Sequence, residues 1–253
     1  MTRTLTVFKV GGSVLERGDA GEAVLDRVAA SWSAGEALLL VHGGGAELSR
    51  WLERLGIASR FSSGQRVTTP EMLPIALMVL GGLINRRLVE ALLRRGCPAV
   101  GVTGADGAGT VGVPADGGGL GAVGTVASVN APFYADLIGS RRLPVVASLA
   151  WSPEHGWLNV NADLMAAALA AGLRARRLWL MTETPGVLTP HGAPLAALHD
   201  GDIDRLIAAG EATDGMVPKL LACRAALRGR VPEVRILGPD GTGTRVLREG
   251  TIG

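Results

Sequence analysis

The sequence has little lysine, little cysteine and few aromatic side chains. Of its 25 basic side chains only two are lysine, Lys9 and Lys219, and all the others are arginine. Positions at which arginine is sufficient have evidently become arginine. The two positions that remain lysine are therefore informative. Lysine is a compact charge on a flexible stem and arginine a wide planar fork, so a tight phosphate pocket can require lysine. Chance survival of two lysines is the simpler alternative at this point.

The other scarcities exclude several classes of protein. Two cysteines, Cys97 and Cys223, form neither a disulfide framework nor a metal-ligand pattern, which fits a reducing compartment. The longest apolar runs, such as residues 75–84, fall short of a membrane span, and no signal-peptide pattern precedes the first predicted strand. A formal net charge of +2 with interspersed signs gives no basic face for nucleic acid. We expect a cytoplasmic protein that binds neither membrane nor nucleic acid.

Short apolar strands alternate with amphipathic helices along the chain. Strands are predicted at residues 5–10, 37–41, 99–103, 145–149, 178–182 and 233–237, and helices at 20–33, 46–55, 70–95, 163–171, 202–209 and 218–227. Such alternation is typical of parallel strands joined by right-handed crossovers. The sequence therefore predicts an α/β fold with an open, mostly parallel central sheet sandwiched by helices. Glycine-rich residues 104–130 predict hairpins beside a cleft.

The predicted helix at residues 70–95 is the longest. Thr69 can cap it, Pro70 suits its first position, and Gly96 and Pro98 end it, giving a length of roughly 39 Å. A Gly-Gly pair at residues 81–82 predicts close packing against a neighbour, for which a twin subunit is one candidate. For the chain as a whole we expect two lobes, residues 1–172 and 173–253, hinged near Gly172.

Two predicted strands end in glycine-rich turns. Gly11-Gly12 and Gly43-Gly44-Gly45 each follow a strand and precede a helix, so their bare N–H groups can face an anion. Either run alone is also typical of a simple tight turn. Neither has the spacing of a dinucleotide-binding or Walker loop, so a phosphate site here would be of a different kind.

Five motifs that occur in order along the chain give a more specific indication. They are Lys9-Val-Gly-Gly-Ser13, His42-Gly-Gly-Gly45, Gly64-Gln-Arg66-Val-Thr68, Asn159-Val-Asn161-Ala-Asp163 and Asp214-Gly-Met-Val-Pro-Lys219. Together they resemble the amino-acid kinase family, and most closely its members that phosphorylate N-acetyl-L-glutamate in arginine biosynthesis. The resemblance covers residues 5–253, including residues 101–107 and 121–130. It implies the amino-acid kinase fold and phosphoryl transfer from ATP to the side-chain carboxylate of N-acetyl-L-glutamate.

The resemblance implies catalytic roles for three residues. Lys9 and Lys219 would flank the transferred phosphoryl group from opposite lobes, and Asp163 would hold both lysines in place. Pro218 suits the first position of the predicted helix, which puts Lys219 in its first turn, where the helix dipole favours phosphate and disfavours a lysine with a merely structural role. For Asp163, capping of its own helix is the structural alternative.

The acceptor and phosphate contacts also follow from the resemblance. Arg66 would grip the α-carboxylate end of the substrate through a bidentate fork, and Asn159 would hydrogen-bond its fixed part. N–H groups of Gly12, Gly44 and Gly45 would meet the reacting carboxylate and phosphoryl oxygens, with Gly11 in the same phosphate-binding turn. His42 is predicted to be a buried structural residue, because an acceptor that is already ionised needs no base.

The nucleotide contacts implied by the resemblance lie in two segments near the C-terminus. They are Thr182, Glu183, Gly186, Val187 and Leu188 in one loop, and Glu211, Ala212 and Thr213 in the other. The family usually has aspartate where this chain has Glu183, which puts the ribose or phosphate contact of that residue in question. Mg²⁺ is expected as a bridge between phosphate oxygens with mostly water ligands, without a dedicated protein cage.

Two other functions stay open. Residues 82–89 look somewhat like relatives that phosphorylate carrier-protein-bound aminoadipate or glutamate in lysine biosynthesis. A non-catalytic nucleotide or amino-acid sensor is the second, and the intact Lys9, Asp163 and Lys219 oppose it. Arginine-sensitive hexamers of the family resemble one another in an extra N-terminal helix, whereas only eight residues precede Lys9 here. We therefore expect a homodimer, formed through the N-terminal lobe and insensitive to arginine.

Overall fold

A computed structural model describes residues 4–12, 18–62, 65–115, 119–189, 191–212 and 215–250. Three residues of the motifs, Ser13, Gly64 and Asp214, lie outside the described residues, as does Thr213. Thr213 is one of the predicted nucleotide contacts, so that prediction is not addressed by the structure.

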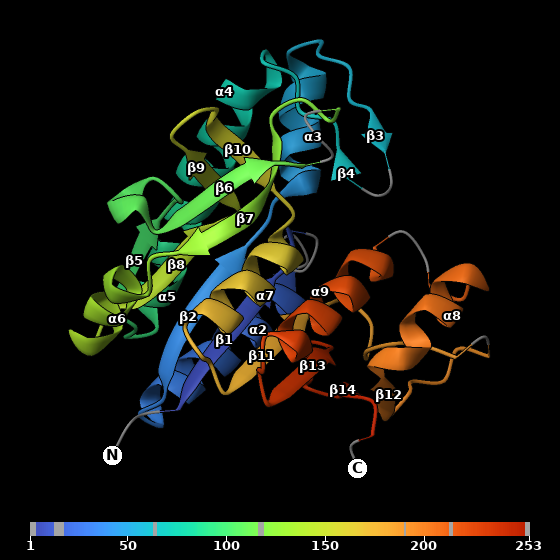
Figure 1. The fold of residues 1–253 in the computed structure, drawn as a ribbon. Helices are drawn as coiled ribbons and strands as arrows, with labels where there is room; N and C mark the ends of the chain where they lie inside the picture. The colour runs from blue at the N-terminus through green and yellow to red at the C-terminus, as the bar shows by residue number, and fades with distance from the viewer. Residues whose placement is uncertain are drawn as a thin grey trace.

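An eight-stranded, mostly parallel sheet forms the centre of the molecule (Figure 1). Its strands run in the order β12-β14-β13-β11-β1-β2-β8-β5. Adjacent strands are parallel except β13 and β14, which pair antiparallel. The strands are β1 (Leu5–Val10), β2 (Ala37–His42), β5 (Ala99–Val102), β8 (Leu143–Ala147), β11 (Arg177–Met181), β12 (Ala197–His199), β13 (Glu233–Leu237) and β14 (Gly243–Leu247). The predicted open, mostly parallel sheet is confirmed.

Helices cover both faces of this sheet because its central strands are apolar on both sides. In β2, Leu39 and Val41 belong to one buried cluster, and Leu38 and Leu40 to the other, as alternation along a strand requires. The first cluster contains residues of α6 (Ala131–Gly139), α7 (Ala162–Gly172), α8 (Ile203–Ala208) and α9 (Met216–Arg228). The second contains residues of α2 (Gly18–Ser33), α3 (Gly45–Arg54), α4 (Met72–Ala76) and α5 (Asn85–Arg94). The predicted sandwich of helices is confirmed.

A small closed barrel adjoins the sheet. It consists of β6 (Thr110–Pro114), β7 (Val123–Val129), β9 (Leu149–Ser152) and β10 (Gly156–Val160), in the order β10-β7-β6-β9. Only Ser148 separates β8 from β9, and β10 leads directly into α7, so the barrel stands at the ends of central strands. A two-stranded sheet of β3 (Phe61–Ser62) and β4 (Gln65–Arg66) lies near α3 (Figure 1). Short 3₁₀ turns cover Asp106–Ala108 and Asp200–Asp202.

The predicted long helix is present but irregular. It begins at Met72, so the prediction that Pro70 occupies the first helical position is wrong, although the Thr69 hydroxyl accepts the Met72 N–H at 3.3 Å. Between α4 and α5 the stretch Leu77–Ile84 is π-helical. A Cβ on Gly81 would lie 3.3 Å from Thr103 Cγ2 and 3.5 Å from Leu149 Cδ1, so this glycine packs closely within its own chain.

Among the described residues, the same helix is the one segment long and apolar enough, by length and composition alone, to cross a membrane. Met72–Arg94 contains an 18-residue window with a mean hydropathy of 1.5, although the uninterrupted apolar run within it is shorter than a membrane span. Met72, Val79, Leu88 and Leu92 are buried in the second core cluster. Packing against the sheet therefore accounts for the apolar side of this helix.

The sequence missed or misplaced six further features. Helix α6 was missed, although Asn130 caps it by accepting the Phe133 N–H and a proline lies in its first turn. The predicted strand at residues 145–149 spans the end of β8 and the start of β9, and the β9–β10 hairpin, β12 and β14 were also missed. Helix α9 begins at Met216, so the prediction that Pro218 is its first residue is wrong. Proline is tolerated there because first-turn N–H groups have no intrahelical acceptor.

Candidate active site

A cavity of about 330 Å³ lies where β1 and β2 end and α3 and α7 begin. Its charged lining residues are Lys9, Arg66, Asp163 and Lys219, with a formal charge of +2. The other residues that line it are Gly11, Gly12, Gly43, Gly44, Gly45, Ala46, Leu48, Phe61, Leu80, Val123, Ser148, Asn159, Val160, Asn161 and Ala162. The structure thus brings together every predicted catalytic, acceptor and phosphate-binding residue. The net positive charge suits an anionic ligand.

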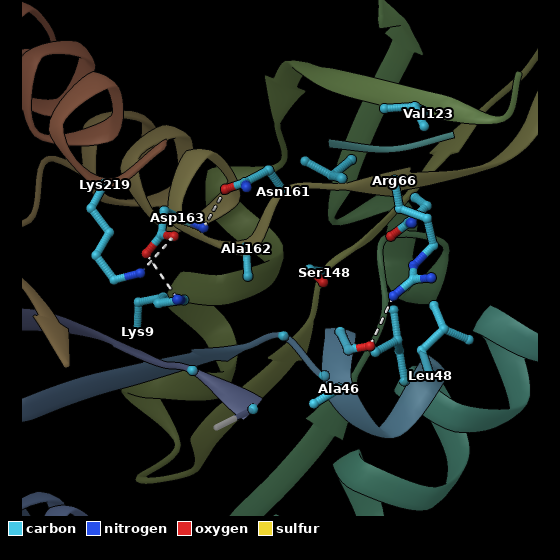
Figure 2. A pocket seen from close by; sticks show the side chains of 18 of the residues that line it. Lys9, Ala46, Leu48, Arg66, Val123, Ser148, Asn161, Ala162, Asp163 and Lys219 are labelled. Carbon is cyan, nitrogen blue, oxygen red and sulfur yellow. Dashed lines mark hydrogen bonds and ion pairs between the residues drawn. The ribbon is translucent and has the colours of Figure 1, made fainter. Parts of the chain in front are cut away.

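The two lysines meet on one carboxylate at one end of this cavity (Figure 2). Lys9 Nζ, from β1, lies 2.9 Å from Asp163 Oδ1. Lys219 Nζ, from α9, lies 3.6 Å from Asp163 Oδ2 and also donates to the Gly215 carbonyl at 3.1 Å. The Lys9 and Asp163 side chains are each only 6% exposed, and that of Lys219 is 14% exposed. Two cations and one carboxylate leave one positive charge facing the cavity.

The charges of this cluster determine its protonation. Burial alone would raise the pKa of Asp163, but the charges of Lys9 and Lys219 outweigh it and lower that pKa below its ordinary value. Burial lowers the pKa of Lys9, helped by the charge of Lys219 and opposed by Asp163. Asp163 therefore stays ionised, and its charge opposes the loss of the Lys9 proton in a site where burial favours the neutral amine.

Asp163 is free to hold the lysines because another residue caps its helix. Asn161 Oδ1 accepts the N–H groups of Asp163 and Leu164 at 2.9 and 3.2 Å. Capping of α7 by Asp163 itself, the structural alternative, is therefore ruled out. The spacing Asn161-Ala-Asp163 places the cap and the carboxylate side by side at the cavity wall.

The glycine turns after β1 and β2 pack against each other. A Cβ on Gly12 would lie 3.0 Å from Gly44 Cα, and a Cβ on Gly44 would overlap the side chain of Ile84. Gly44 is the N-cap of α3 and Gly45 its first residue, so N–H groups of the first turn lack intrahelical acceptors. Such a helix N-terminus binds anions.

Arg66 lies on the other side of the cavity, with Ser148 between it and the lysine cluster (Figure 2). Its guanidinium donates to the Gly45 carbonyl at 2.9 Å, to Ser49 Oγ at 2.6 Å and to Ser59 Oγ at 2.5 Å. The Phe61 ring centroid is 4.6 Å from its Cζ. Both hydrogens of Nη2 are directed at protein oxygens, so a bidentate ligand contact requires an exchange of these bonds.

Asn159 and His42 are also held by protein contacts. Asn159 Nδ2 donates to Thr68 Oγ1 at 3.0 Å, which fixes this side chain at the cavity wall. His42 is fully buried, and burial lowers its pKa to about 4. The prediction that His42 is a buried residue is confirmed, and it is neutral at physiological pH.

The predicted nucleotide residues that the structure describes lie outside the lining of this cavity. Thr182 follows β11, whose last residue Met181 is in register with Val10 of β1, so it lies at the same edge of the sheet as Gly11. Further along this loop, Val187 is buried and its N–H donates to Thr244 Oγ1 at 2.8 Å. Gly186 (φ +92°) and Leu188, which bridges to Pro194, continue the loop, and Glu211 and Ala212 follow α8.

Several lining residues were not predicted from the sequence. Ser148 directly follows a central parallel strand, a position where ligands bind in open α/β sheets, so a signal for it existed. Asn161 was part of a quoted motif without an assigned role. For Leu48, Leu80 and Val123 the sequence carries no signal, because only the tertiary fold brings these apolar side chains to the cavity.

A protein cage for a metal was not found in the described ranges, which contain no group of three or more His, Cys, Asp or Glu side chains able to hold an ion. The only carboxylate that lines the cavity in the described part of the chain, Asp163, is taken up by the two lysines. The described residues therefore complement a phosphate group more than a bare cation.

An open parallel sheet whose central strands end in glycine turns, beside two lysines and an ionised aspartate, defines a phosphate-binding α/β protein. Comparison with known proteins makes this class specific. The chain belongs to the amino acid kinase family, whose sequence model matches residues 4–238. The resemblance inferred from the five motifs is thereby confirmed.

Individual relatives agree with the family assignment. The chain is 44% identical to an acetylglutamate kinase of Koribacter versatilis over 235 residues, which cover 91% of this chain and 89% of the relative. It is 38% identical to an acetylglutamate kinase of Geobacillus sp., again over 91% of this chain and 89% of the relative. The crystal structure of the smu.665 protein of Streptococcus mutans superposes with a TM-score of 0.88 at 29% identity, covering 96% of this chain and 98% of that one.

Proposed function

We propose that the protein transfers the γ-phosphoryl group of ATP to the side-chain carboxylate of N-acetyl-L-glutamate, producing N-acetyl-L-glutamyl 5-phosphate in arginine biosynthesis. The observation that carries the proposal is the pair of lysines, 2.9 and 3.6 Å from Asp163, beside two glycine turns. The choice of acceptor is supported by relatives named acetylglutamate kinase at 36% to 44% identity. These relatives favour neither the carrier-bound acceptor nor the sensor.

The proposed phosphoryl transfer requires stabilisation of negative charge more than proton transfer. An oxygen of the acceptor carboxylate attacks the γ-phosphorus, the bond from that phosphorus to the bridging oxygen breaks, and ADP leaves. The acceptor is already an anion, so no base is needed. Lys9 would neutralise the acceptor side and Lys219 the nucleotide side, with Asp163 fixing both ammonium groups at positions where charge develops.

The acceptor would lie between the glycine turns and Arg66. N–H groups of Gly12, Gly44 and Gly45 would bind the reacting oxygens, with Gly11 in the same turn. Arg66 would bind the α-carboxylate end after exchanging one of its protein acceptors, and Asn159 would contact the fixed part of the substrate. This assignment is supported by the lining of the cavity, which contains all six residues.

We assign acceptor binding to residues 1–172 and nucleotide binding to residues 173–253. Among the described residues that line the cavity, only Lys219 comes from the second segment. The nucleotide would extend from Lys219 toward Thr182, Glu183, Gly186 and Leu188, and toward Glu211 and Ala212. Val187 would act by shaping this loop, because its side chain is buried and its N–H is already bonded. Mg²⁺ would bridge phosphate oxygens and keep mostly water ligands.

We also propose a cytoplasmic homodimer. The long helix supports the dimer, because Met78 and Leu93 on it are 62% and 53% exposed, unlike its buried side. Light scattering of the purified protein tests this assembly, and a monomer at micromolar concentration would refute it.

A hydroxamate-trapping assay tests the proposed reaction. Hydroxylamine converts an acyl phosphate to a hydroxamate, so the product is detected only if a carboxylate has been phosphorylated. The assay compares N-acetyl-L-glutamate, L-glutamate and N-acetyl-aminoadipate with ATP and Mg²⁺, with Asp163→Asn as the inactive control. Turnover of N-acetyl-L-glutamate well above the other two is expected, and its absence in folded protein would refute the assignment.

A further inference from the structure

A buried chain of hydrogen bonds runs beneath the glycine turn that follows β2. Arg86 Nη2 donates to Asn85 Oδ1 at 2.5 Å, and Asn85 Nδ2 lies 2.9 Å from the Val145 carbonyl and 3.0 Å from His42 Nε2. On the other side of the ring, His42 Nδ1 lies 2.9 Å from the Gly43 carbonyl. His42 and Asn85 are both completely buried. The reaction proposed above assigns no direct role to these hydrogen bonds.

The donor at one end of this hydrogen-bond chain and the acceptor at the other determine the position of each proton within it. Arginine can only donate, so the Asn85 atom that faces Arg86 is the amide oxygen and the atom that faces His42 is the amide nitrogen. His42 Nε2 must therefore accept. A carbonyl can only accept, so His42 Nδ1 carries the ring proton and donates it to Gly43. His42 is thus a neutral imidazole in the Nδ1–H form.

This proton fixes the orientation of a peptide group at the cavity. No peptide bond in the described structure is cis, and in a trans peptide the N–H points opposite to the preceding carbonyl. When His42 holds the Gly43 carbonyl inward, the Gly44 N–H points away from the ring. Gly44 lines the cavity, and among the described residues its N–H has no hydrogen-bond acceptor.

We propose that His42 is a positioning residue: its Nδ1–H orients the Gly43–Gly44 peptide so that the Gly44 N–H donates to an anionic oxygen in the cavity. The proposal rests on the proposed function only in identifying that oxygen as one of the reacting carboxylate or phosphoryl group. Asn85 and Arg86 act through His42 by fixing its tautomer. Gly101 makes room for them, because a Cβ there would overlap Asn85 Oδ1 and Arg86 Nη2.

Nuclear magnetic resonance of the wild-type protein tests the tautomer without any substrate. The chain has four histidines, His42, His155, His191 and His199, so ¹⁵N-histidine labelling gives a spectrum that single substitutions can assign. Two-bond ¹H–¹⁵N correlations should show His42 at neutral pH with a protonated Nδ1 and an unprotonated Nε2. An Nε2–H tautomer or an imidazolium ring would overturn the proposal.

Two variants whose side chains have the same number and branching of heavy atoms separate positioning from packing. Asparagine can place an amide N–H near the position of the imidazole Nδ1, whereas leucine fills space without a donor. We expect kcat to fall about tenfold to a hundredfold in His42→Leu, by analogy with loss of an oxyanion donor, and to recover most of that loss in His42→Asn. Equal kcat values in the two folded variants, or an unimpaired His42→Leu, would overturn the proposal.

The two experiments also separate this proposal from the proposed function. If wild-type protein does not phosphorylate N-acetyl-L-glutamate, the proposed function fails while the tautomer measurement still decides the hydrogen-bond chain. If His42→Leu does not fold, the tautomer in the wild type decides alone. Melting temperatures of both variants, measured beside the kinetics, show which case applies.

Discussion

The two ends of the cavity hold their cations in different ways. At one end Lys9 and Lys219 share a single carboxylate, and the three charges leave one positive charge in excess. At the other end Arg66 meets no carboxylate within ion-pair distance in the described part of the chain, and neutral oxygens of Gly45, Ser49 and Ser59 surround its guanidinium. The first end therefore presents an excess positive charge to a ligand. At the second end, hydrogen bonds to the protein hold the guanidinium of Arg66 in place.

This difference explains why lysine occurs at one end and arginine at the other. A lysine ammonium is compact enough to share the buried Asp163 and still present hydrogens to a ligand. Arg66 reaches three acceptors at once, two on α3 and one in the loop that follows it, which a single ammonium cannot do with the same geometry. Swapping the two residue types should therefore damage the two ends differently, and the predictions below use this contrast.

The largest effect is expected for Lys9→Arg. The side chain of Lys9 is 6% exposed, so a guanidinium keeps the charge but has no room to keep the 2.9 Å contact with Asp163. We expect kcat to fall at least about a hundredfold, roughly 3 kcal/mol, because the charge no longer matches the transition state. Lys219→Arg should also lose most of its kcat. A folded Lys9→Arg protein with wild-type kcat would show that the lysine end needs charge alone.

A slightly smaller effect is expected for His42, which is buried beneath the glycine turn that follows β2. Burial lowers the pKa of His42 to about 4, so between pH 6.5 and 4 the unfolded chain takes up a proton that the folded protein does not. Stability should therefore fall as the pH falls, by about 2 to 3 kcal/mol at pH 4.5. Urea unfolding at pH 7 and 4.5 should show this loss of stability due to His42 in the wild type and in His155→Leu. The loss should be absent in His42→Leu. The same pH dependence in all three would contradict it.

At the arginine end, Arg66→Lys should cost less. The substitution loses part of a set of charged hydrogen bonds, so we expect about 2 kcal/mol lower stability and a KM for the acceptor raised about tenfold. Arg60→Lys, an exposed position in the same segment, should change stability by less than about 0.5 kcal/mol. If Arg66→Lys lowers kcat but leaves acceptor KM unchanged, the contrast between the two ends is wrong.

The smallest effect is expected for Glu183→Gln, outside the cavity. Removing one charge from a half-buried loop residue should raise the KM for ATP about threefold, less than 1 kcal/mol, and leave the KM for the acceptor unchanged. Steady-state kinetics with each substrate varied in turn measures both constants. Equal changes in both would argue against a separate nucleotide segment.

The sequence predicted the lysine end better than the arginine end. Lys9 lies near the end of a strand, and Asp163 and Lys219 lie close to the starts of two helices at the same edge of a parallel sheet, so motif order and topology together predict that they meet. The acceptors of Arg66 are set by loop packing between α3 and the β3–β4 hairpin, which no spacing in the sequence encodes. The same holds for the hydrogen bond from Asn85 to His42, which joins residues 43 positions apart.

Local signals explain most of the differences in the fold. Helix α6 could have been found from Asn130 and Pro132, and the β9–β10 hairpin from Pro153 and Gly156, whose φ is +69°. The π-helical stretch at Leu77–Ile84 could not, because its sequence is an ordinary apolar helical pattern. Short edge strands such as β12 depend on pairing partners distant in sequence.

A crystal structure with N-acetyl-L-glutamate and a non-hydrolysable ATP analogue tests the central claim most directly. We expect the side-chain carboxylate of the acceptor to lie against the N–H groups of Gly44 and Gly45, its α-carboxylate to lie at Arg66, and the γ-phosphoryl group to lie between Lys9 and Lys219. An acceptor bound in the reverse direction, or a γ-phosphoryl group that contacts neither lysine, would contradict the account.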